Sequence, residues 1–207
     1  MHGDDKMKLH LGCGKNNFDG WVNVDKYSSA DIHPDIHADI YDDIVVLKNF
    51  EKESVDEIYT SHVVEHITPQ DFIKALKRWF EILKQGGVLI IRCPDARLYL
   101  KNWLDLSDDE RFIESINSAG SLNCVLGFQT KGPGYQNRNL FTEGLLSKYL
   151  KFVGFEVDES RKVSCRGGDL LRSLKSGRSD EGVIYEGVPI RDLWCKAIKP
   201  SNSVVIS

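Results

Sequence analysis

The sequence predicts a single α/β domain, and three features of the chain support this prediction. Stretches typical of strands and of helices alternate through the first half of the chain, as expected of a sheet with helices packed against it. A short apolar stretch, residues 7–11, runs directly into a glycine turn at Gly12 and Gly14. Residues 88–91 are an unbroken apolar run, which is typical of a strand buried on both faces. The length of 207 residues suits one such domain.

The composition argues against several classes of protein. The 27 basic and 31 acidic residues give a net charge of −4, without a long run of lysine or arginine, so a dedicated nucleic-acid binder is not expected. No apolar run exceeds four residues, whereas a membrane span needs about 20. The first eight residues are polar and charged, so no signal peptide is expected. The five cysteines form no Cys-x-x-Cys pair, which favours a reducing cytoplasmic location and no zinc ribbon.

Three more strands are expected before residue 62, and a polar side chain follows each of them. The strands are residues 21–24, 36–38 and 57–60, and the polar residues after them are Asp25, Asp39 and Ser61. Ligands bind open α/β sheets at the carboxyl ends of parallel strands. We therefore expect these side chains to line one crevice.

The clearest predicted helix begins after Thr68. Thr68 suits the N-cap, Pro69 the first helical position, and Asp71 completes a start that resembles a capping box. Apolar residues recur at helical spacing behind this start. Gly86 and Gly87 are predicted to stop the helix.

The rest of the chain alternates in the same way. Thr142 is expected to cap a helix that Gly154 ends. The other expected elements are a helix at residues 97–104, a short helix opening at Ser107-x-x-Glu110, a loop at residues 119–139, a strand at residues 155–157, an exposed hairpin tip at residues 173–182 and a final strand at residues 193–198.

The glycine turn is the first feature with chemical content. Glycine lets the backbone turn tightly and lets a ligand approach the main chain. A dinucleotide fingerprint would need a third glycine where the chain has Asn17, so a nicotinamide or flavin dinucleotide is disfavoured. Asp25 suits a ribose, because one carboxylate can accept hydrogen bonds from both hydroxyl groups. Asp39 could accept one from an adenine amino group.

Five motifs follow one another along the first half of the chain. They are Lys8-Leu-His-Leu-Gly-Cys-Gly14, Gly20-Trp-Val-Asn-Val-Asp25, Ala38-Asp39-Ile40, Ser54-Val-Asp-Glu-Ile-Tyr-Thr-Ser-His-Val-Val-Glu-His66 and Leu83-Lys-Gln-Gly-Gly-Val-Leu-Ile-Ile-Arg-Cys-Pro-Asp95. In this order they resemble the class I S-adenosylmethionine-dependent methyltransferases, and in particular the small methyltransferase-domain proteins associated with bacterial surface-polysaccharide clusters. The resemblance implies a Rossmann-like fold with a mostly parallel, seven-stranded sheet whose last strand is antiparallel.

The resemblance also implies a site for S-adenosylmethionine. The glycine turn would cradle the methionine part, Asp25 would hold the ribose and Asp39 would meet the adenine. The implied cofactor-binding residues are Leu11, Gly12, Cys13, Gly14, Asp25, Asp39, Ile40, Ser61 and His62. The chain departs from the family in its shortened early crossovers, since residues 15–20 are too few for several helical turns at about 1.5 Å per residue. One side of the cleft is therefore expected to be open, where a partner subunit or a second copy could complete it.

Two histidines are the candidates for catalysis. His62 and His66 are four positions apart and would share one helical face beside Glu65, with His62 as a base or an acceptor contact. Methyl transfer itself requires mainly an acceptor held in line with the cofactor. The same string, His62-Val-Val-Glu65-His66, also fits an inverted zinc-protease motif. A second metal-like cluster consists of His33, Asp35, His37 and Asp39.

The acceptor is expected at the rim beyond these motifs, under a cap or lid formed by residues 96–140. Arg92, Arg97 and Arg138 suit an anionic acceptor, because arginine pairs bidentately with carboxylate and phosphate. Tyr135 is a further expected contact. The prediction is therefore a cytoplasmic, single-domain methyltransferase for a small-molecule or sugar-linked acceptor, with oxygen as the favoured methylated atom. Two alternatives stay open: a non-catalytic cofactor-binding or scaffold subunit, and a zinc-dependent hydrolase.

Overall fold

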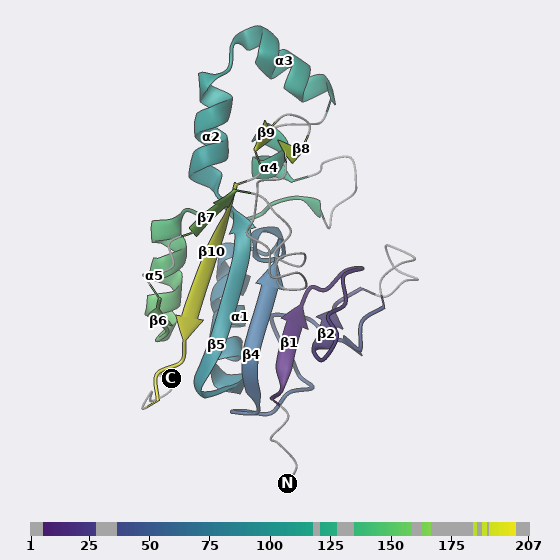
Figure 1. Ribbon diagram of the computed structural model, residues 1–207, viewed down its shortest axis with the longest axis vertical. Coiled ribbons are helices and arrows are strands. Elements are labelled where there is room, and N and C mark those ends of the chain that lie inside the picture. The colour runs from purple at the N-terminus through teal and green to yellow at the C-terminus, as the bar shows by residue number, and fades with distance from the viewer. Residues whose placement is uncertain are drawn as a thin grey trace.

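The chain folds around one large sheet with helices beside it and beyond one of its edges (Figure 1). The computed structural model describes residues 6–27, 37–117, 121–127, 135–158, 163–166, 184–185, 188–189 and 191–201. Among these residues, no helix is long and apolar enough to cross a membrane.

The secondary structure alternates as the sequence predicts. The strands of the main sheet are β1 (Lys8–Leu11), β2 (Val22–Asp25), β3 (Ile40–Tyr41), β4 (Val55–Ser61), β5 (Leu83–Pro94), β6 (Glu156–Val157), β7 (Val163–Arg166) and β10 (Arg191–Ile198). The helices are the 3-10 turn η1 (Val64–His66), α1 (Pro69–Ile82), α2 (Ala96–Asp105), α3 (Asp108–Asn117), α4 (Ser121–Leu126) and α5 (Glu143–Val153). A separate hairpin pairs β8 (Ile184–Tyr185) with β9 (Val188–Pro189).

The sheet runs in the order β3-β2-β1-β4-β5-β10-β6, and β7 adds a further strand beside β10. The first five strands in this order are mutually parallel, whereas β10 lies antiparallel to β5. The mostly parallel sheet and its antiparallel last strand are therefore confirmed. The carboxyl ends of the parallel strands meet at one edge, and α2, α3 and α4 lie beyond that edge (Figure 1).

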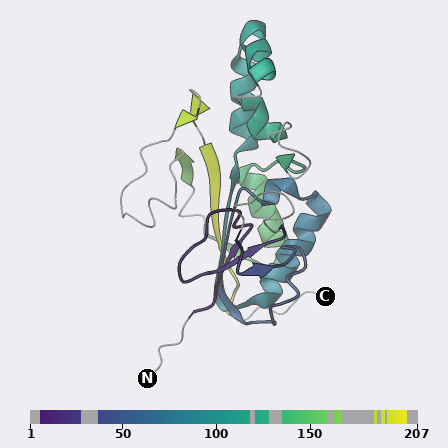
Figure 2. The ribbon, with the colours of Figure 1, turned by 90° about the vertical axis from the view of Figure 1, so that its right-hand side faces the viewer.

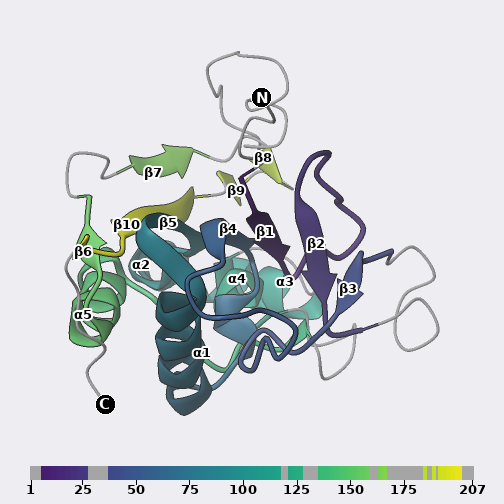
Figure 3. The same cartoon turned by 90° about the horizontal axis from the view of Figure 1, so that it is seen from below.

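Helices α1 and α5 cover one face of the sheet (Figure 2 and Figure 3). Their buried apolar side chains meet those of the strands in one core, as two packed layers require. Both helices begin at the predicted caps: the Thr68 side chain accepts a hydrogen bond from the Asp71 N–H, and the Thr142 side chain accepts one from the Leu145 N–H. Gly154 ends α5 in a left-handed conformation, also as predicted.

The opposite face carries no helix between β1 and β2, because residues 12–21 form turns and irregular structure. The shortened first crossover is therefore confirmed. Aromatic side chains cover this part of the sheet instead: Phe18 stacks on His10 with ring centroids 4.0 Å apart and lies 5.5 Å from the Tyr59 ring. Asn23 fixes the loop, since its side chain accepts from the Phe18 N–H (2.8 Å) and donates to the Phe18 carbonyl (3.2 Å).

One predicted boundary is wrong. Gly86 and Gly87 do not stop the helix but lie inside β5. The helix ends earlier, at Ile82, because the next residue, Leu83, is extended and pairs with Val55 at the start of β4. Sheet pairing therefore decides where the helix ends.

Two other local predictions also differ from the structure. Residues 37–38 form no strand, and β3 begins only after Asp39; residue 36 lies outside the described residues. The segment 119–139 contains α4 rather than loop throughout. The hairpin tip expected at residues 173–182 lies outside the part of the chain that the structure describes.

Candidate functional site

The glycine turn follows β1 at the carboxyl edge of the sheet. The Gly12 N–H donates to the Val24 carbonyl (2.8 Å), which anchors the turn to the end of β2. Gly12 has a φ of +68°, in the left-handed region that favours glycine. A Cβ at Gly12 would run into the methyl groups of Val63 in the loop after β4, whereas a Cβ at Gly14 would meet open space. The turn therefore packs Gly12 against a neighbouring loop and leaves room beside Gly14.

Asp25 lies directly beside this turn, at the end of β2. Its carboxylate accepts hydrogen bonds from the Gly14 N–H (2.9 Å) and the Tyr27 N–H (3.0 Å), and the residue is only 8% exposed. A carboxylate offers about four lone-pair positions, so acceptor capacity remains for two hydroxyl donors. Asp25 therefore fits the expected role toward a ribose.

Asp39 lies at the start of β3 and not at the carboxyl end of a strand. One of its oxygens accepts from the backbone N–H (2.7 Å) and the side-chain amide (2.8 Å) of Asn23. A contact between Asp39 and an adenine therefore stays a prediction and would fall to the other carboxylate oxygen. The next residue, Ile40, pairs with Val24 of β2.

Besides Asp25, two of the implied cofactor residues have buried side chains. The Leu11 side chain is fully buried in the core, so only its backbone can meet a ligand. Burial, together with the charge of Asp25, raises the pKa of the Cys13 thiol to about 12. This cysteine is therefore protonated and unreactive at neutral pH.

His62 follows Ser61 at the end of β4 and is held by two carboxylates. Its Nε2 lies 3.0 Å from Oδ2 of Asp192, and its Nδ1 lies 3.2 Å from Oε1 of Glu65. Desolvation alone would lower the pKa of His62, but the hydrogen bonds and charges of Asp192 and Glu65 raise it to about 10. Both ring nitrogens therefore carry protons at neutral pH, which makes His62 a poor general base.

Sequence reasoning missed Asp192, which completes this cluster from β10. Its Oδ2 atom accepts from the Nε (2.7 Å) and Nη2 (2.6 Å) atoms of Arg92, besides His62. Burial would raise the pKa of the Asp192 carboxyl, but the His62 hydrogen bond and both positive charges lower it. Arg92 was expected at the acceptor rim. Its guanidinium instead forms this ion pair with only 14% of the side chain exposed, so little of it remains for an anionic acceptor.

His62 and His66 do not share a helical face, and this prediction is wrong. His62 precedes the single 3-10 turn η1 and His66 is its last residue, because the α-helix begins only at Pro69. His66 Nδ1 lies 3.2 Å from the carbonyl oxygen of Gln136, to which it donates. Carboxylates contact both ring nitrogens of His62. Within the described ranges, no group of three metal-binding side chains occurs. His33 and Asp35 of the second cluster lie outside those ranges.

The remaining predicted acceptor residues lie near the same edge. Arg97 is exposed in the first turn of α2, which Asp95 caps. The Arg138 N–H donates to the Glu65 carbonyl (2.7 Å), which places the segment 135–139 over the loop after β4. Tyr135, half-buried, begins this segment. The structure thus places the backbone of Arg138 beside Glu65 of the His62 cluster, and Arg97 in the first turn of α2.

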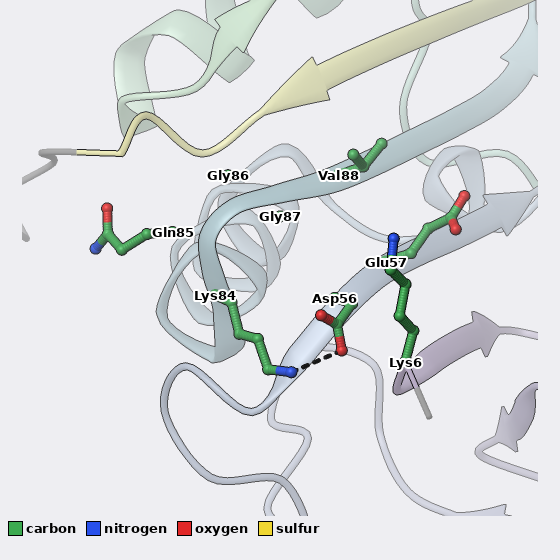
Figure 4. Close-up of a pocket in the computed structure, with 8 residues that line it drawn as sticks. All are labelled: Lys6, Asp56, Glu57, Lys84, Gln85, Gly86, Gly87 and Val88. Atoms are coloured by element: carbon green, nitrogen blue, oxygen red, sulfur yellow. Dashed lines mark hydrogen bonds and ion pairs between the residues drawn. The ribbon is translucent and has the colours of Figure 1, made fainter. Parts of the chain in front are cut away.

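A shallow cavity of about 190 Å³ lies at the opposite edge of the sheet, near the amino end of β4 (Figure 4). An ion pair of 2.8 Å between Lys84 and Asp56 lies in its lining, beside Gly86 and Gly87. None of the predicted site residues lines this cavity. The candidate site is therefore the carboxyl edge, where the glycine turn, Asp25 and His62 converge.

Comparisons with known proteins support a methyltransferase domain in this part of the chain. Residues 9–91, which include all of these groups, match a family model described as a methyltransferase domain. No curated protein sequence matches the chain. Among solved structures, the chain is similar to an S-adenosylmethionine-dependent methyltransferase from Methanosarcina mazei, with 17% sequence identity and a TM-score of 0.56; the match covers 97% of this chain and 95% of the M. mazei chain. It is also similar to one from Archaeoglobus fulgidus, with 16% identity and a TM-score of 0.53; that match covers 94% of this chain and 86% of the A. fulgidus chain.

A third similar structure includes a partner protein. It is the complex of the Haloferax volcanii Trm112 methyltransferase activator with a methyltransferase (14% identity, 95% of this chain and 83% of that chain, TM-score 0.55). Identities this low show a shared fold, which is the Rossmann-like fold of class I methyltransferases. The shared fold and the domain match together support an enzyme that uses S-adenosylmethionine.

Proposed function

We propose that the chain transfers the methyl group of S-adenosylmethionine to an oxygen atom of a small-molecule or sugar-linked acceptor. The observation that carries the proposal is the hydrogen bond between the Gly14 N–H and Asp25. It joins the backbone turn and the buried acid that would receive the methionine and ribose parts of the cofactor. Both residues lie within the stretch that matches the methyltransferase domain.

The residues at the carboxyl edge fit this cofactor. The space beside Gly14 is open, and Asp25 keeps acceptor positions for the two ribose hydroxyls. Asp39 and Ile40 would meet the adenine, and Ser61 borders the same edge from β4. We assign these roles on the resemblance together with this fit.

The bound cofactor would supply an electrophilic methyl group for in-line displacement. The chain then has to hold the acceptor in line and keep water away. His62 has no free ring nitrogen, and the Nδ1 of His66 donates to a backbone carbonyl. We therefore assign proton abstraction to neither histidine: an acceptor hydroxyl would release its proton to solvent, and we propose positioning as the main source of catalysis.

The proposed acceptor is anionic and binds under the cap of residues 96–140. Two exposed arginines at this edge, Arg97 and Arg138, would pair with its carboxylate or phosphate, and Tyr135 would contact it. The resemblance to proteins of surface-polysaccharide clusters favours a sugar-linked acceptor made in the cytoplasm. The free thiols of Cys13, Cys93 and Cys195 suit such a reducing location.

A partner subunit or a second copy would complete the cleft on its open side. The first crossover carries no helix there, and a similar structure holds an activator protein beside its methyltransferase. This part of the proposal predicts that turnover rises when the missing chain is supplied.

Calorimetric titration with S-adenosylmethionine and S-adenosylhomocysteine tests the cofactor site. We expect the wild-type protein to bind both and an Asp25→Ala variant to lose about 1–3 kcal/mol of binding free energy, or about 5- to 150-fold in affinity. Asp43→Ala removes an equal charge from a nearby exposed ion pair with Lys26 and should leave the affinity unchanged.

Absence of binding by the wild-type protein would contradict the cofactor assignment. Binding without turnover on any sugar-linked or other anionic acceptor, followed as release of S-adenosylhomocysteine, would instead favour a cofactor-binding scaffold. Thermal melts of each variant separate loss of binding from loss of the fold.

A further inference from the structure

His62 has a backbone conformation that is rare outside glycine. Its φ is +56°, in the left-handed region. Its N–H donates to the Arg92 carbonyl (3.0 Å), and its ring bridges Glu65 and Asp192. Such conformations persist where the surroundings over-determine them, and they concentrate at ligand sites.

The residue that follows His62 touches the glycine turn. The methyl groups of Val63 fill the space that a side chain at Gly12 would need. From the other side, the N–H groups of Gly12 (2.8 Å) and Cys13 (3.2 Å) both donate to the Val24 carbonyl. The turn is therefore held between β2 and Val63, and the backbone direction at His62 decides where Val63 presses on it.

We propose that His62 is a positioning residue: clamped by Glu65 and Asp192, it holds Val63 against Gly12 and so preorganises the turn that receives the cofactor. Only the last step, cofactor binding, rests on the proposed function. Asp192 lies 130 residues further along the chain, so the clamp also ties β10 to this turn.

The titratable groups of this cluster come from four elements. Glu65 of η1 and Asp192 of β10 contact the imidazole. Tyr59 of β4 and Arg92 and Cys93 of β5 interact electrostatically with those carboxylates. The two carboxylates keep the ring doubly protonated at neutral pH. Asp192→Asn removes one of them, so the histidine should titrate closer to its ordinary value of about 6.5.

The test is a pH titration of the wild-type protein and Asp192→Asn between pH 6 and 9. Nitrogen-15 NMR follows the His62 ring and the Gly12 and Gly14 amides, and calorimetry follows the affinity for S-adenosylhomocysteine. In the wild type, we expect a constant imidazolium and a constant affinity. In Asp192→Asn, the NMR signals of the His62 ring and of the Gly12 and Gly14 amides should titrate with the same midpoint. Above that pH, the affinity for S-adenosylhomocysteine should fall about tenfold. Asp109→Asn, an equal charge change on the exposed α3, is the control and should behave as the wild type.

Each result decides between distinct alternatives. A titrating ring with unmoved glycine amides would overturn the proposal, and so would moving amides with an unchanged affinity. If the wild-type protein binds no cofactor, the proposed function fails, while co-titration of the ring and amides still supports the coupling of His62 to the turn. If Asp192→Asn does not fold, Glu65→Gln loosens the other half of the clamp and takes its place.

Discussion

At the scale of single residues, Gly12 meets two separate constraints. Its φ of +68° disfavours any side chain, and a Cβ would also collide with Val63. Left-handed backbone costs about 1–2 kcal/mol for other residues, and overpacking adds about 1–3 kcal/mol. Gly12→Ala should therefore lower the free energy of unfolding by about 2–5 kcal/mol, measured in urea.

Gly14 supplies the matched control. Its φ is also positive, at +53°, but open space surrounds its missing side chain. Gly14→Ala should therefore cost only about 1–2 kcal/mol, and adding Val63→Ala should recover part of the Gly12→Ala loss. Equal costs for the two glycines would mean that contact with Val63 is unimportant.

The pH dependence of stability depends on another single residue, His10. Burial lowers its pKa to about 4, so the unfolded chain, with a pKa near 6.5, binds the proton more tightly. The stabilisation is complete above about pH 6.5 and is lost as the pH falls through 4, by at most about 3 kcal/mol. Unfolding free energies at pH 4.5 and 7 should differ less in His10→Gln than in the wild type. An identical difference in both proteins would disprove this account.

At the scale of elements, helix α1 begins at a cap that local sequence encodes. The Thr68 hydroxyl accepts from the Asp71 N–H (3.2 Å) and donates to the Asp71 carboxylate (2.9 Å). Thr68→Ala should cost about 1 kcal/mol of unfolding free energy, measured by urea denaturation. Thr68→Ser keeps both bonds and should cost much less; an equal loss would point to the methyl group rather than the cap.

Helix caps and buried strands could be predicted from the sequence, whereas an element boundary set by strand pairing could not. Caps at Thr68 and Thr142 and the buried run in β5 are local, so their residues predict them directly. Gly86 wrongly predicts the end of the helix, because the chain is already extended and paired with β4 from Leu83 onward. Such pairing depends on distant residues and overrides local propensity.

The candidate site also contains one contact that the nearby sequence suggests and one that depends on distant residues. The bond between Gly14 and Asp25 joins two motifs only 11 residues apart, and their types and spacing suggest it. The contact of His62 with Asp192 spans 130 residues and depends on the antiparallel register of β10 on β5. The spacing of His62 and His66 wrongly suggested one helical face, because the α-helix begins only at Pro69.

At the scale of the whole molecule, the second face of the sheet lacks the usual early helix beside β1. Phe18 takes part of its place: it is 7% exposed, it stacks on His10, and its edge meets Trp21 at a centroid distance of 5.7 Å. If this aromatic cluster replaces the packing of a helix, removing one of its rings should lower the free energy of unfolding as much as a mutation in the core. Phe18→Ala should then lower the unfolding free energy by about 3–5 kcal/mol.

Phe152 on α5 is the matched control, because 68% of it is exposed and its replacement by alanine should change little. Urea unfolding followed by both tryptophan fluorescence and circular dichroism measures the two variants. One coincident transition in Phe18→Ala would mean that the aromatic cluster belongs to the same cooperative unit as the core under α1. An earlier fluorescence transition would mean that the loop between β1 and β2 unfolds by itself, and that the turn carrying Gly14 and Asp25 is ordered only in part without a ligand or partner. A small loss in a single transition would contradict the idea that aromatic packing replaces the missing helix.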